Sequence, residues 1–304
     1  MPNITFNCDR FVIQNSNNMK KTVLITGGNS FIAQHLIPIL KMNYNVKLLT
    51  RTPKFENEYA WDLSNKTMDE AALDDVDAIV HLAGSKLNDG TPLTEERKKL
   101  VYDSRIGAAD FLREKLIERH QTIDSFVSAS AIGYYGFNDE TFEIDENGQK
   151  GVGFAADLSE DWEKAADRFK DSSVAKHVSK IRVSLVLGKE GGIFPFYRNL
   201  VEQNPEIINQ NNSSYVPWNH VEDMAGIFAY AVENSLDGVY NSVAPEPASQ
   251  QQIYNAISNA LKTQDIRESS PYSGHHLVSN KIQKAGYVFK FKTIQEAVED
   301  ILKD

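Results

Sequence analysis

A strand, a glycine turn and the start of a helix follow one another in the stretch TVLITGGNSFIAQHL, which begins at Thr22. Its VLI segment is the continuous apolar run expected of a parallel strand buried on both faces. Gly27 and Gly28 permit a sharp turn because neither has a Cβ atom, and Asn29 or Ser30 is placed to cap the helix. A helix N-terminus reached through such a turn binds anions, most often the pyrophosphate of a dinucleotide. The stretch therefore predicts a nucleotide-binding α/β protein.

The turn departs from the TGxxGxxG form in two places, where this chain has Ser30 and Ala33. Alanine at the last position still allows the helix to pack closely on the strand. Ser30 is the larger departure, since glycine there lets the backbone approach the phosphates. Two outcomes stay open: the backbone amides still bind the pyrophosphate, or the turn has lost its cofactor.

Strands and helices alternate through the first two thirds of the chain. Further strands are expected at 45–50, 58–61, 77–84, 125–130 and 180–187, with helices at 94–120 and 158–170. This alternation predicts an α/β fold with a Rossmann-type doubly wound parallel sheet. Beyond Gly188 the rhythm changes, and we expect a smaller C-terminal α+β substrate cap. The elements expected beyond Gly188 are a helix opened by Gly191 and Gly192 that runs to Leu200, a helix ending at 232, a strand at 238–243, and helices at 250–261 and 294–302.

These expectations divide the chain into three parts. Residues 1–18 are Asn-rich and lack the basic start and apolar core of a signal peptide, so we expect a disordered leader. Residues 19–187 and about 219–244 form the expected NAD(P)-binding domain. Residues 188–218 and 245–304 form the expected substrate-binding cap.

Composition narrows the class of partner. The net charge of −10 disfavours nucleic acid and anionic membrane surfaces, which require a basic patch. No apolar run approaches the roughly 18 residues that span a bilayer. The single cysteine, Cys8, suits a reducing compartment. We expect a cytoplasmic protein that binds a small molecule.

The end of the second strand bears on the choice of cofactor. In this fold an acidic residue there binds the ribose 2′-hydroxyl of NAD, and a basic one accommodates the 2′-phosphate of NADP. The strand at 45–50 is followed by Arg51, and the first acid is Glu56. Arg51 therefore favours NADP (NADPH) over NAD, although a solvated surface arginine is the alternative reading.

Other candidates lie at the ends of later strands. Asp62 is placed to accept a hydrogen bond from adenine while Leu63 packs on the ring; the alternative is that Asp62 caps the segment 68–73. Ala83 and Gly84 leave room for a cofactor at the carboxyl edge of the sheet. His81 lies inside an apolar run and is expected to be a core residue rather than a base.

Several segments, taken in order, resemble the extended short-chain dehydrogenase/reductase superfamily, and more closely its atypical epimerase-like branch, often labelled cell-division-inhibitor-like. They are TVLITGG at 22–28, VHLAG at 80–84, DSR at 103–105, SASAIGYYG at 128–136, DWEKAA at 161–166, RVSLVLGKEGGIF at 182–194, WNHVEDM at 218–224, GVYNSVAPEP at 238–247 and AGYVFKF at 285–291. The resemblance implies a Rossmann core, a bound NADP(H), a cap that selects the substrate, and a homodimer formed through the helices at 94–120 and 158–170. The cofactor contacts that it and the fold imply are Gly27, Gly28, Asn29, Ser30, Phe31, Ile32, Arg51, Asp62, Leu63, Leu82, Ala83, Gly84 and Ser104.

The catalytic residues of the family are only partly present. Classical members use a tyrosine, a lysine four residues later and a serine after the fifth strand; the lysine lowers the pKa of the tyrosine, which transfers the proton. Ser130 matches the serine, but the tyrosine position falls at Phe154 and the lysine position at Leu158. Tyr134 or Tyr135 is the candidate substitute, because the loop after the fifth strand passes near the nicotinamide in this fold. The alternative is that these tyrosines pack against the core or shape the substrate site.

The cap contributes a second group of candidates. Trp218 and His220 follow a loop and precede a helix, as residues at a pocket rim do, and we expect them to contact substrate. The alternatives are that Asp223 caps that helix and that His220 bonds locally. No metal site is expected, because the adjacent His275 and His276 cannot both face one ion in a strand or helix.

Two functions remain open from the sequence. One is an NADP(H)-dependent oxidoreductase or epimerase acting on a small hydroxyl- or carbonyl-bearing, sugar-like substrate. The other is a non-catalytic dinucleotide-binding regulator or assembly factor, which the missing tyrosine and lysine favour. Fold alone does not decide between them.

Overall fold

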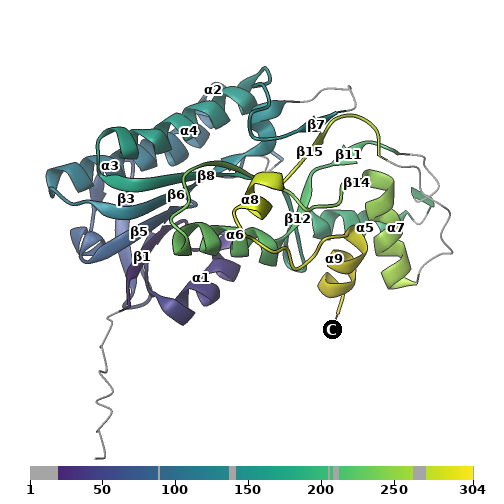
Figure 1. The fold of residues 1–304 in the computed structure, drawn as a ribbon, viewed down its shortest axis with the longest axis horizontal. Coiled ribbons are helices and arrows are strands. Elements are labelled where there is room, and N and C mark those ends of the chain that lie inside the picture. Colours follow the sequence, from purple (N-terminus) through teal and green to yellow (C-terminus); the bar gives the residue numbers. More distant parts are fainter. Residues whose placement is uncertain are drawn as a thin grey trace, which may run out of the picture.

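The computed structural model describes residues 20–87, 90–136, 142–204, 206–207, 212–262 and 272–303. The expected leader at 1–18 lies outside the described residues, as does part of the polar loop at 137–153. Two parts of the structure concern function: a large sheet with helices on both faces, and a smaller group of elements beyond one edge of it (Figure 1).

The large sheet of the described chain has eight strands in the order β13-β8-β6-β5-β1-β2-β3-β4. All neighbouring pairs are parallel except β3 with β4. The bounds are β1 (Thr22–Thr26), β2 (Asn45–Thr50), β3 (Glu58–Asp62), β4 (Thr67–Met68), β5 (Val76–His81), β6 (Ile123–Ala131), β8 (Ala175–Val183) and β13 (Gly238–Ser242). The prediction of a Rossmann-type parallel sheet is confirmed.

Strand β1 lies near the middle of the sheet and is buried along its whole length. Its register places Thr26 beside His81 of β5 and beside Leu49 of β2, so neighbouring strands end at one carboxyl edge. The helices α1 (Phe31–Asn43) and α6 (Val221–Glu233) pack together on one face, and α3 (Ala108–Glu118) and α4 (Phe154–Asp171) on the other (Figure 1). Because both faces are covered, the strands are apolar without alternation.

The helix expected at 94–120 is interrupted. It consists of α2 (Glu95–Tyr102), a π-helical turn η2 (Asp103–Gly107) and α3, with Thr94 as N-cap. Such turns insert one residue into a helix and are frequent at functional sites. Here the turn contains Ser104 and Arg105, which belong to the DSR segment at 103–105.

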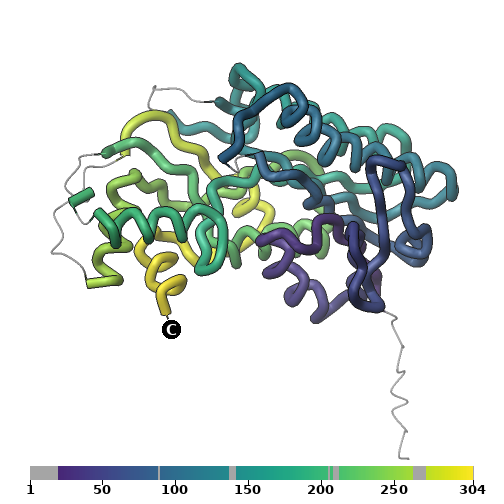
Figure 2. The backbone as a smooth tube through the Cα atoms, turned by 180° about the vertical axis from the view of Figure 1, so that it is seen from behind, coloured from purple at the N-terminus to yellow at the C-terminus, as the bar shows by residue number. Residues whose placement is uncertain are grey.

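The remaining elements lie beyond the carboxyl edge and have a hydrophobic cluster of their own, which includes Trp218, Phe194 and Phe291. Figure 2 shows from behind that the last part of the chain returns to this group. The elements are β7 (Glu143–Ile144), β9 (Leu185–Gly188), β10 (Gly191–Gly192), α5 (Phe194–Gln203), β11 (Tyr215–Val216), β12 (Trp218–His220), β14 (Ala248–Ser249), α7 (Gln250–Leu261), β15 (His276–Leu277), α8 (Asn280–Lys284) and α9 (Ile294–Ile301). They form small sheets in the orders β10-β9-β12, β11-β14 and β15-β7.

Three expected element boundaries were wrong. The strand expected at 180–187 is two strands, because the chain leaves the large sheet after Val183 and β9 pairs with β12 instead. Gly191 and Gly192 form β10 opposite β9 rather than the start of a helix, since their backbone pairs with Gly188 and Leu187. The helix expected at 158–170 starts at Phe154.

The carboxylate of Asp223 anchors the C-terminal segment to helix α6. It accepts hydrogen bonds from the amides of Lys290 and Phe291 (both 2.8 Å) and from the hydroxyl of Tyr287 (2.9 Å). Asp223 is 1% exposed. Asp223 is not the cap of α6, as one sequence alternative had it; the side chain of His220 is.

We predict that Asp223→Ala lowers the free energy of unfolding by about 3 kcal/mol, because the amides of Lys290 and Phe291 lose their acceptor. The matched control is Glu222→Ala, which removes the neighbouring carboxylate from an exposed ion pair with Lys290 and should cost less than about 1 kcal/mol. Denaturant unfolding followed by circular dichroism measures both. Equal losses in the two variants would contradict this role for Asp223.

Candidate functional site

The ends of β1 and β5 are joined by the side chain of Thr26. Its hydroxyl accepts hydrogen bonds from the amides of Leu82 (3.2 Å) and Ala83 (3.1 Å) and pairs with Nδ1 of His81 (2.9 Å). The Nε2 of His81 lies 3.0 Å from the carbonyl oxygen of Arg105. Burial lowers the pKa of His81 to about 4. The prediction that His81 is a satisfied core residue, not a base, is confirmed.

Gly27 begins the turn, and only a residue without a side chain fits at this position. Its φ is +68°, and a Cβ atom would lie 2.7 Å from the carbonyl oxygen of Leu82. The turn therefore rests directly on the end of β5. A Cβ atom on Gly28 would lie 3.3 Å from the side chain of Leu48 on β2, which is tighter than an ordinary contact.

Ser30 is the N-cap of α1, which decides between the two caps the sequence allowed. Its hydroxyl accepts from the amide of Ala33 (3.2 Å), and its backbone has ordinary angles of φ −71° and ψ 154°. The first helical hydrogen bond runs from the amide of Gln34 to the carbonyl of Ser30 (3.0 Å). The amides of Phe31 and Ile32 precede that bond and point out of the helix N-terminus, as an anion site requires.

The turn also touches the group of elements beyond the edge. A Cβ atom on Gly188 or on Gly191 would lie 2.5 Å from the ring of Phe31, so that ring covers both glycines. The β9–β10 hairpin is thereby held against the first turn of α1.

Arg51, Asp62 and Leu63 follow the neighbouring strands β2 and β3. Arg51 is exposed and has no ion-pair partner among the described residues. Asp62 is occupied locally: its carboxylate accepts from the amides of Ser64 (2.9 Å) and Asn65 (3.3 Å). The alternative that Asp62 caps segment 68–73 is wrong, since the short helix η1 (Glu70–Leu73) is capped by Asp69.

Ser104 and Arg105 lie against the segment that follows β5. The hydroxyl of Ser104 accepts from the amide of Ser85 (2.9 Å), and Nη1 of Arg105 donates to the carbonyl of Ser85 (2.9 Å). A Cβ atom on Gly84 would lie 2.9 Å from the guanidinium carbon of Arg105. The π turn thus directs two successive side chains onto one strip of backbone. Lys86, another candidate cation, is exposed.

Ser130 ends in a buried network of charged residues. Its hydroxyl donates to Glu163 Oε1 (2.7 Å), and both carboxylate oxygens of Glu163 accept from Arg182 (2.7 and 2.9 Å). Arg182 is 2% exposed. Burial acts to lower the pKa of Arg182, but Glu163 outweighs it and raises that pKa.

The two candidate tyrosines differ in their surroundings. The hydroxyl of Tyr135 donates to Asn241 Oδ1 (2.7 Å) and accepts from Arg182 Nη1 (2.7 Å), and burial raises its pKa to about 12. Tyr134 is half-buried, and its ring lies 3.6 Å from the guanidinium carbon of Arg182. Tyr134 therefore has the freer hydroxyl, while Tyr135 is held inside the network.

Phe154 and Leu158 occupy the first turns of α4, where the sequence placed the missing tyrosine and lysine. Gly133, just before the tyrosines, packs on Ala155 of that turn, with a Cβ–Cβ separation of 3.3 Å for an added Cβ. The polar residue that α4 directs at Ser130 is Glu163 instead.

Trp218 and His220 lie deeper than a pocket rim. They are 1% and 2% exposed, and the indole nitrogen of Trp218 has no partner among the described residues. Nδ1 of His220 accepts from the amide of Glu222 (3.2 Å), and its ring lies 4.0 Å from that of Phe291. Burial lowers the pKa of His220 to about 4.

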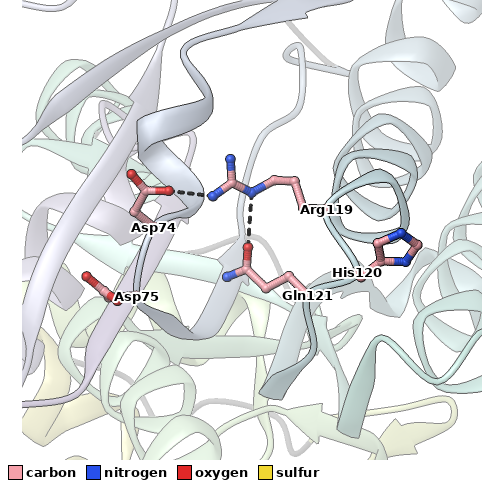
Figure 3. A pocket seen from close by; sticks show the side chains of 5 residues that line it. All are labelled: Asp74, Asp75, Arg119, His120 and Gln121. Carbon is pink, nitrogen blue, oxygen red and sulfur yellow. Dashed lines mark hydrogen bonds and ion pairs between the residues drawn. The ribbon is translucent and has the colours of Figure 1, made fainter.

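A surface pocket lies at the other edge of the sheet, lined by Asp74, Asp75, Arg119, His120 and Gln121 (Figure 3). Arg119 forms an ion pair with Asp74 and donates to Gln121 Oε1 (3.3 Å). These residues precede β5 and β6, so the pocket is remote from the glycine turn. Two of its charged residues, Arg119 and Asp74, are already paired with each other.

The described residues lack two further features, a metal-binding cluster and a membrane-spanning helix. No cluster of three or more His, Cys, Asp or Glu side chains in that part of the chain has the geometry to hold a metal ion. Nor does any helix there have the length and apolar character needed to cross a bilayer.

Glu163, Arg182, Asn241 and Arg105 were not among the sequence candidates. Glu163 carried a usable signal, because it is a charge on the otherwise mostly apolar face of α4. Arg182 did not, because β8 also contains Lys176, His177 and Lys180. Arg105 entered the sequence analysis only as part of the DSR segment at 103–105, with no role of its own. Its contact with Gly84 depends on the π turn, which spacing alone does not predict.

Comparison with known proteins matches the chain to related sequences and folds. Residues 23–152 match the NAD dependent epimerase/dehydratase family. An epimerase family protein of Mycobacterium leprae is 27% identical over 297 residues, covering 92% of this chain and 95% of that one. The human epimerase family protein SDR39U1 is 27% identical over 304 residues, covering 92% and 99%. A crystal structure of human SDR39U1 with NADPH superposes with a TM-score of 0.74 at 24% identity over 92% of this chain and 98% of that chain.

The parallel sheet, the glycine turn and the elements beyond the carboxyl edge define a Rossmann-type α/β fold. Residues 23–152 are similar to the NAD dependent epimerase/dehydratase family, and relatives named epimerase family protein align with more than nine tenths of the chain. The resemblance read from the ordered motifs is thereby confirmed at the level of the family.

Two buried neutral histidines predict acid sensitivity. Unfolded histidine has a pKa of about 6.5, whereas His81 and His220 have folded values of about 4. The unfolded chain therefore binds more protons between pH 6.5 and 4, so stability falls as the pH falls through that window. We expect each histidine to account for about 2 kcal/mol of lost stability at pH 5 relative to pH 7.

The measurement is the free energy of unfolding at pH 7 and pH 5. His81→Gln should be less stable than wild type at pH 7 but lose about 2 kcal/mol less on acidification. His120→Asn, which changes an exposed histidine, is the control and should keep the wild-type pH dependence. A wild-type pH dependence in His81→Gln would contradict the assignment.

Proposed function

We propose that this protein binds NADP(H) at the carboxyl edge of its large sheet and acts as an oxidoreductase or epimerase on a small carbonyl- or hydroxyl-bearing, sugar-like substrate. The observation that carries the proposal is the N-terminus of α1, delivered by β1 through Gly27 onto the end of β5. Nicotinamide dinucleotide binding is supported by the match to an NAD dependent family and by the NADPH in the human SDR39U1 structure.

The residues present fit a dinucleotide. The amides of Phe31 and Ile32 would hold the pyrophosphate, and the Ser30 hydroxyl, turned toward Ala33, leaves those amides free. The cofactor wall would consist of Leu82, Ala83 and Gly84. The full set of cofactor residues that we propose is Gly27, Gly28, Asn29, Ser30, Phe31, Ile32, Arg51, Asp62, Leu63, Leu82, Ala83, Gly84 and Ser104.

A bound nicotinamide supplies hydride transfer, which leaves the chain to position a substrate oxygen and move a proton. We assign the proton to the hydroxyl of Tyr134, because that of Tyr135 is already bonded to Asn241 and Arg182. Arg182 lies over the Tyr134 ring, and this cation–π contact holds the ring in place. Ser130, Trp218 and His220 are the proposed residues that orient the substrate.

A second candidate function is dinucleotide binding without turnover, as a regulatory or assembly protein. Phe154 and Leu158 favour it, since neither can transfer a proton or lower the pKa of a tyrosine. The bond from Ser130 to Glu163 also favours it, because the serine hydroxyl is directed away from a substrate.

The molecular context that we propose is a cytoplasmic protein with a small-molecule substrate, no nucleic acid or membrane partner, and homodimerisation through α2–α3 and α4. The cofactor domain would comprise 19–187 and about 219–244, and the cap 188–218 and 245–304. A monomeric mass at all concentrations in light scattering would reject the dimer.

The proposed role of Arg51 predicts a preference for NADPH over NADH. NADPH fluorescence should rise on binding, and Arg51→Ala should weaken NADPH about tenfold while leaving NADH unchanged, because only NADPH carries the 2′-phosphate. Arg198→Ala is the control, as it removes an exposed arginine of α5. A wild-type protein that binds neither nucleotide would refute the proposed function. Equal weakening of both nucleotides would refute the role of Arg51.

The second prediction separates catalysis from binding. Across a panel of sugar, carbonyl and hydroxyl substrates, Tyr134→Phe should lower kcat by 100-fold or more, the usual contribution of a positioned acid or base, and leave NADPH affinity unchanged. Tyr102→Phe is the matched control, since its hydroxyl bonds to the exposed Asp161. Cofactor binding with no turnover by wild type on any of the substrates would favour the non-catalytic function.

A further inference from the structure

Arg105 is a half-buried arginine at the carboxyl edge, and no described residue is an acidic partner for it. Its Nη1 donates to the carbonyls of Ser85 (2.9 Å) and Val101 (3.1 Å). Its Nε is buried, and neither Nε nor Nη2 donates to any residue in the described part of the chain. The guanidinium lies 5.0 Å from the ring centre of Trp162 on α4. The Trp162 ring and two carbonyl oxygens therefore hold the guanidinium of Arg105 in place, and its Nε and Nη2 can still donate hydrogen bonds.

The other buried arginine of this chain provides the comparison. Arg182 has both oxygens of Glu163 on its guanidinium, which offsets the cost of burial and raises its pKa. Burial, together with the like charge of Arg97, lowers the pKa of Arg105 to about 10. Arg105 stays protonated at neutral pH. Burying a cation that no carboxylate neutralises costs free energy, and a bound anion would offset that cost.

The location of Arg105 indicates which ligand that is. Its guanidinium carbon would be 2.9 Å from a Cβ atom on Gly84, while a Cβ on Gly27 would be 2.7 Å from the carbonyl of Leu82. The phosphate turn and Arg105 therefore rest on the same short segment, Leu82–Gly84. Any residue larger than glycine at 84 would collide with the guanidinium. The N-terminus of α1 and Arg105 are thus two positive groups on one strip of the edge.

We propose that Arg105 is an anion-binding residue of this site and that it takes an oxyanion, a phosphate or carboxylate group, through its unpaired guanidinium nitrogens. Arginine suits this task because its planar donors match two oxygens of one such group. The π turn at Asp103–Gly107 places it there, while Ser104 holds the Ser85 amide. The proposal rests on the proposed function, and the oxyanion has two sources: the pyrophosphate of the cofactor or an acidic group of the substrate.

A purely structural role is the competing account. The two bonds of Nη1 attach the segment after β5 to the π turn, and losing them would destabilise the fold whatever the ligand. They do not account for the charge, since a neutral donor could also bond to carbonyl oxygens. The two accounts differ in whether anion binding changes when the charge is removed and the stem is kept.

The test uses the full chain and two variants. Arg105→Met keeps an unbranched stem on Trp162 and removes the charge; Arg105→Lys keeps the charge as a single point. NADPH affinity is measured by fluorescence, and the stabilisation of the free and the NADPH-loaded protein by inorganic phosphate or acetate is measured as the shift in Tm. Arg198→Met, on α5, controls for the loss of one positive charge.

If the oxyanion is the cofactor pyrophosphate, Arg105→Met weakens NADPH at least tenfold and Arg105→Lys weakens it less. If it belongs to the substrate, NADPH affinity is unchanged and the Tm shift of the NADPH-loaded protein with phosphate or acetate is lost in Arg105→Met. Either result supports the proposal. A lower Tm in Arg105→Met with both binding measurements at wild-type values overturns it and leaves the structural role.

A failure of the proposed function is distinguishable from a failure of this inference. A wild-type chain that does not bind NADPH refutes the cofactor but still shows, in its free form, whether phosphate stabilisation depends on Arg105. If that stabilisation is present and is lost in Arg105→Met, the anion site stands without the cofactor. If it is absent from wild type, or unchanged in the variant, the inference falls.

Discussion

The contact between the ends of β1 and β5 is the constraint on which the candidate site depends. Thr26 accepts hydrogen bonds from the amides of Leu82 and Ala83, and Gly27 brings the turn within 2.7 Å, measured from an added Cβ atom, of the same backbone. A larger residue at 27 would be forced into a positive φ and into that carbonyl. The N-terminus of α1, the ring of Phe31 and the β9–β10 hairpin that it covers all take their positions from this contact. The site is therefore built from backbone first and side chains second.

This order explains why Ser30 is compatible with the fold. The dihedral angles at Ser30 are open to any residue, so glycine is not needed there for conformation. Only its bulk could matter, and the hydroxyl is turned into the helix to bond with the amide of Ala33. Ser30 thus replaces the flexibility of a glycine by an N-cap, which stabilises a helix by about 1 kcal/mol. The departure from the glycine pattern is a change in how the helix starts rather than a loss of the anion site.

Much of the fold followed from the sequence, because parallel strands and amphipathic helices have strong periodic patterns. Strand β2 and helix α7 were placed residue for residue, and β1 and α9 to within one. The errors occurred where tertiary pairing decides local structure: β8 stops at Val183 because its continuation pairs with β12, and Gly191 and Gly192 join a hairpin. Of the candidate site, the turn and the strand ends were predictable from residue type. The partners of Ser130 were not, since Glu163 and Arg182 are 33 and 52 positions away in the chain.

The two ends of the candidate site differ in whether their arginines have acidic partners among the described residues. At the cofactor end, backbone geometry keeps the helix N-terminus open, and Arg51 and Arg105 add positive charge without acidic partners among the described residues. At the catalytic end, the buried Arg182 is neutralised by Glu163, and this pair takes up the hydroxyls of Ser130 and Tyr135. A buried ion pair contributes little net stability, but removing one partner is costly, so it fixes its neighbours in one arrangement. The proposed function therefore assigns proton transfer to a group outside the network, and Tyr134, whose ring is stacked on Arg182, is the group that the network itself positions.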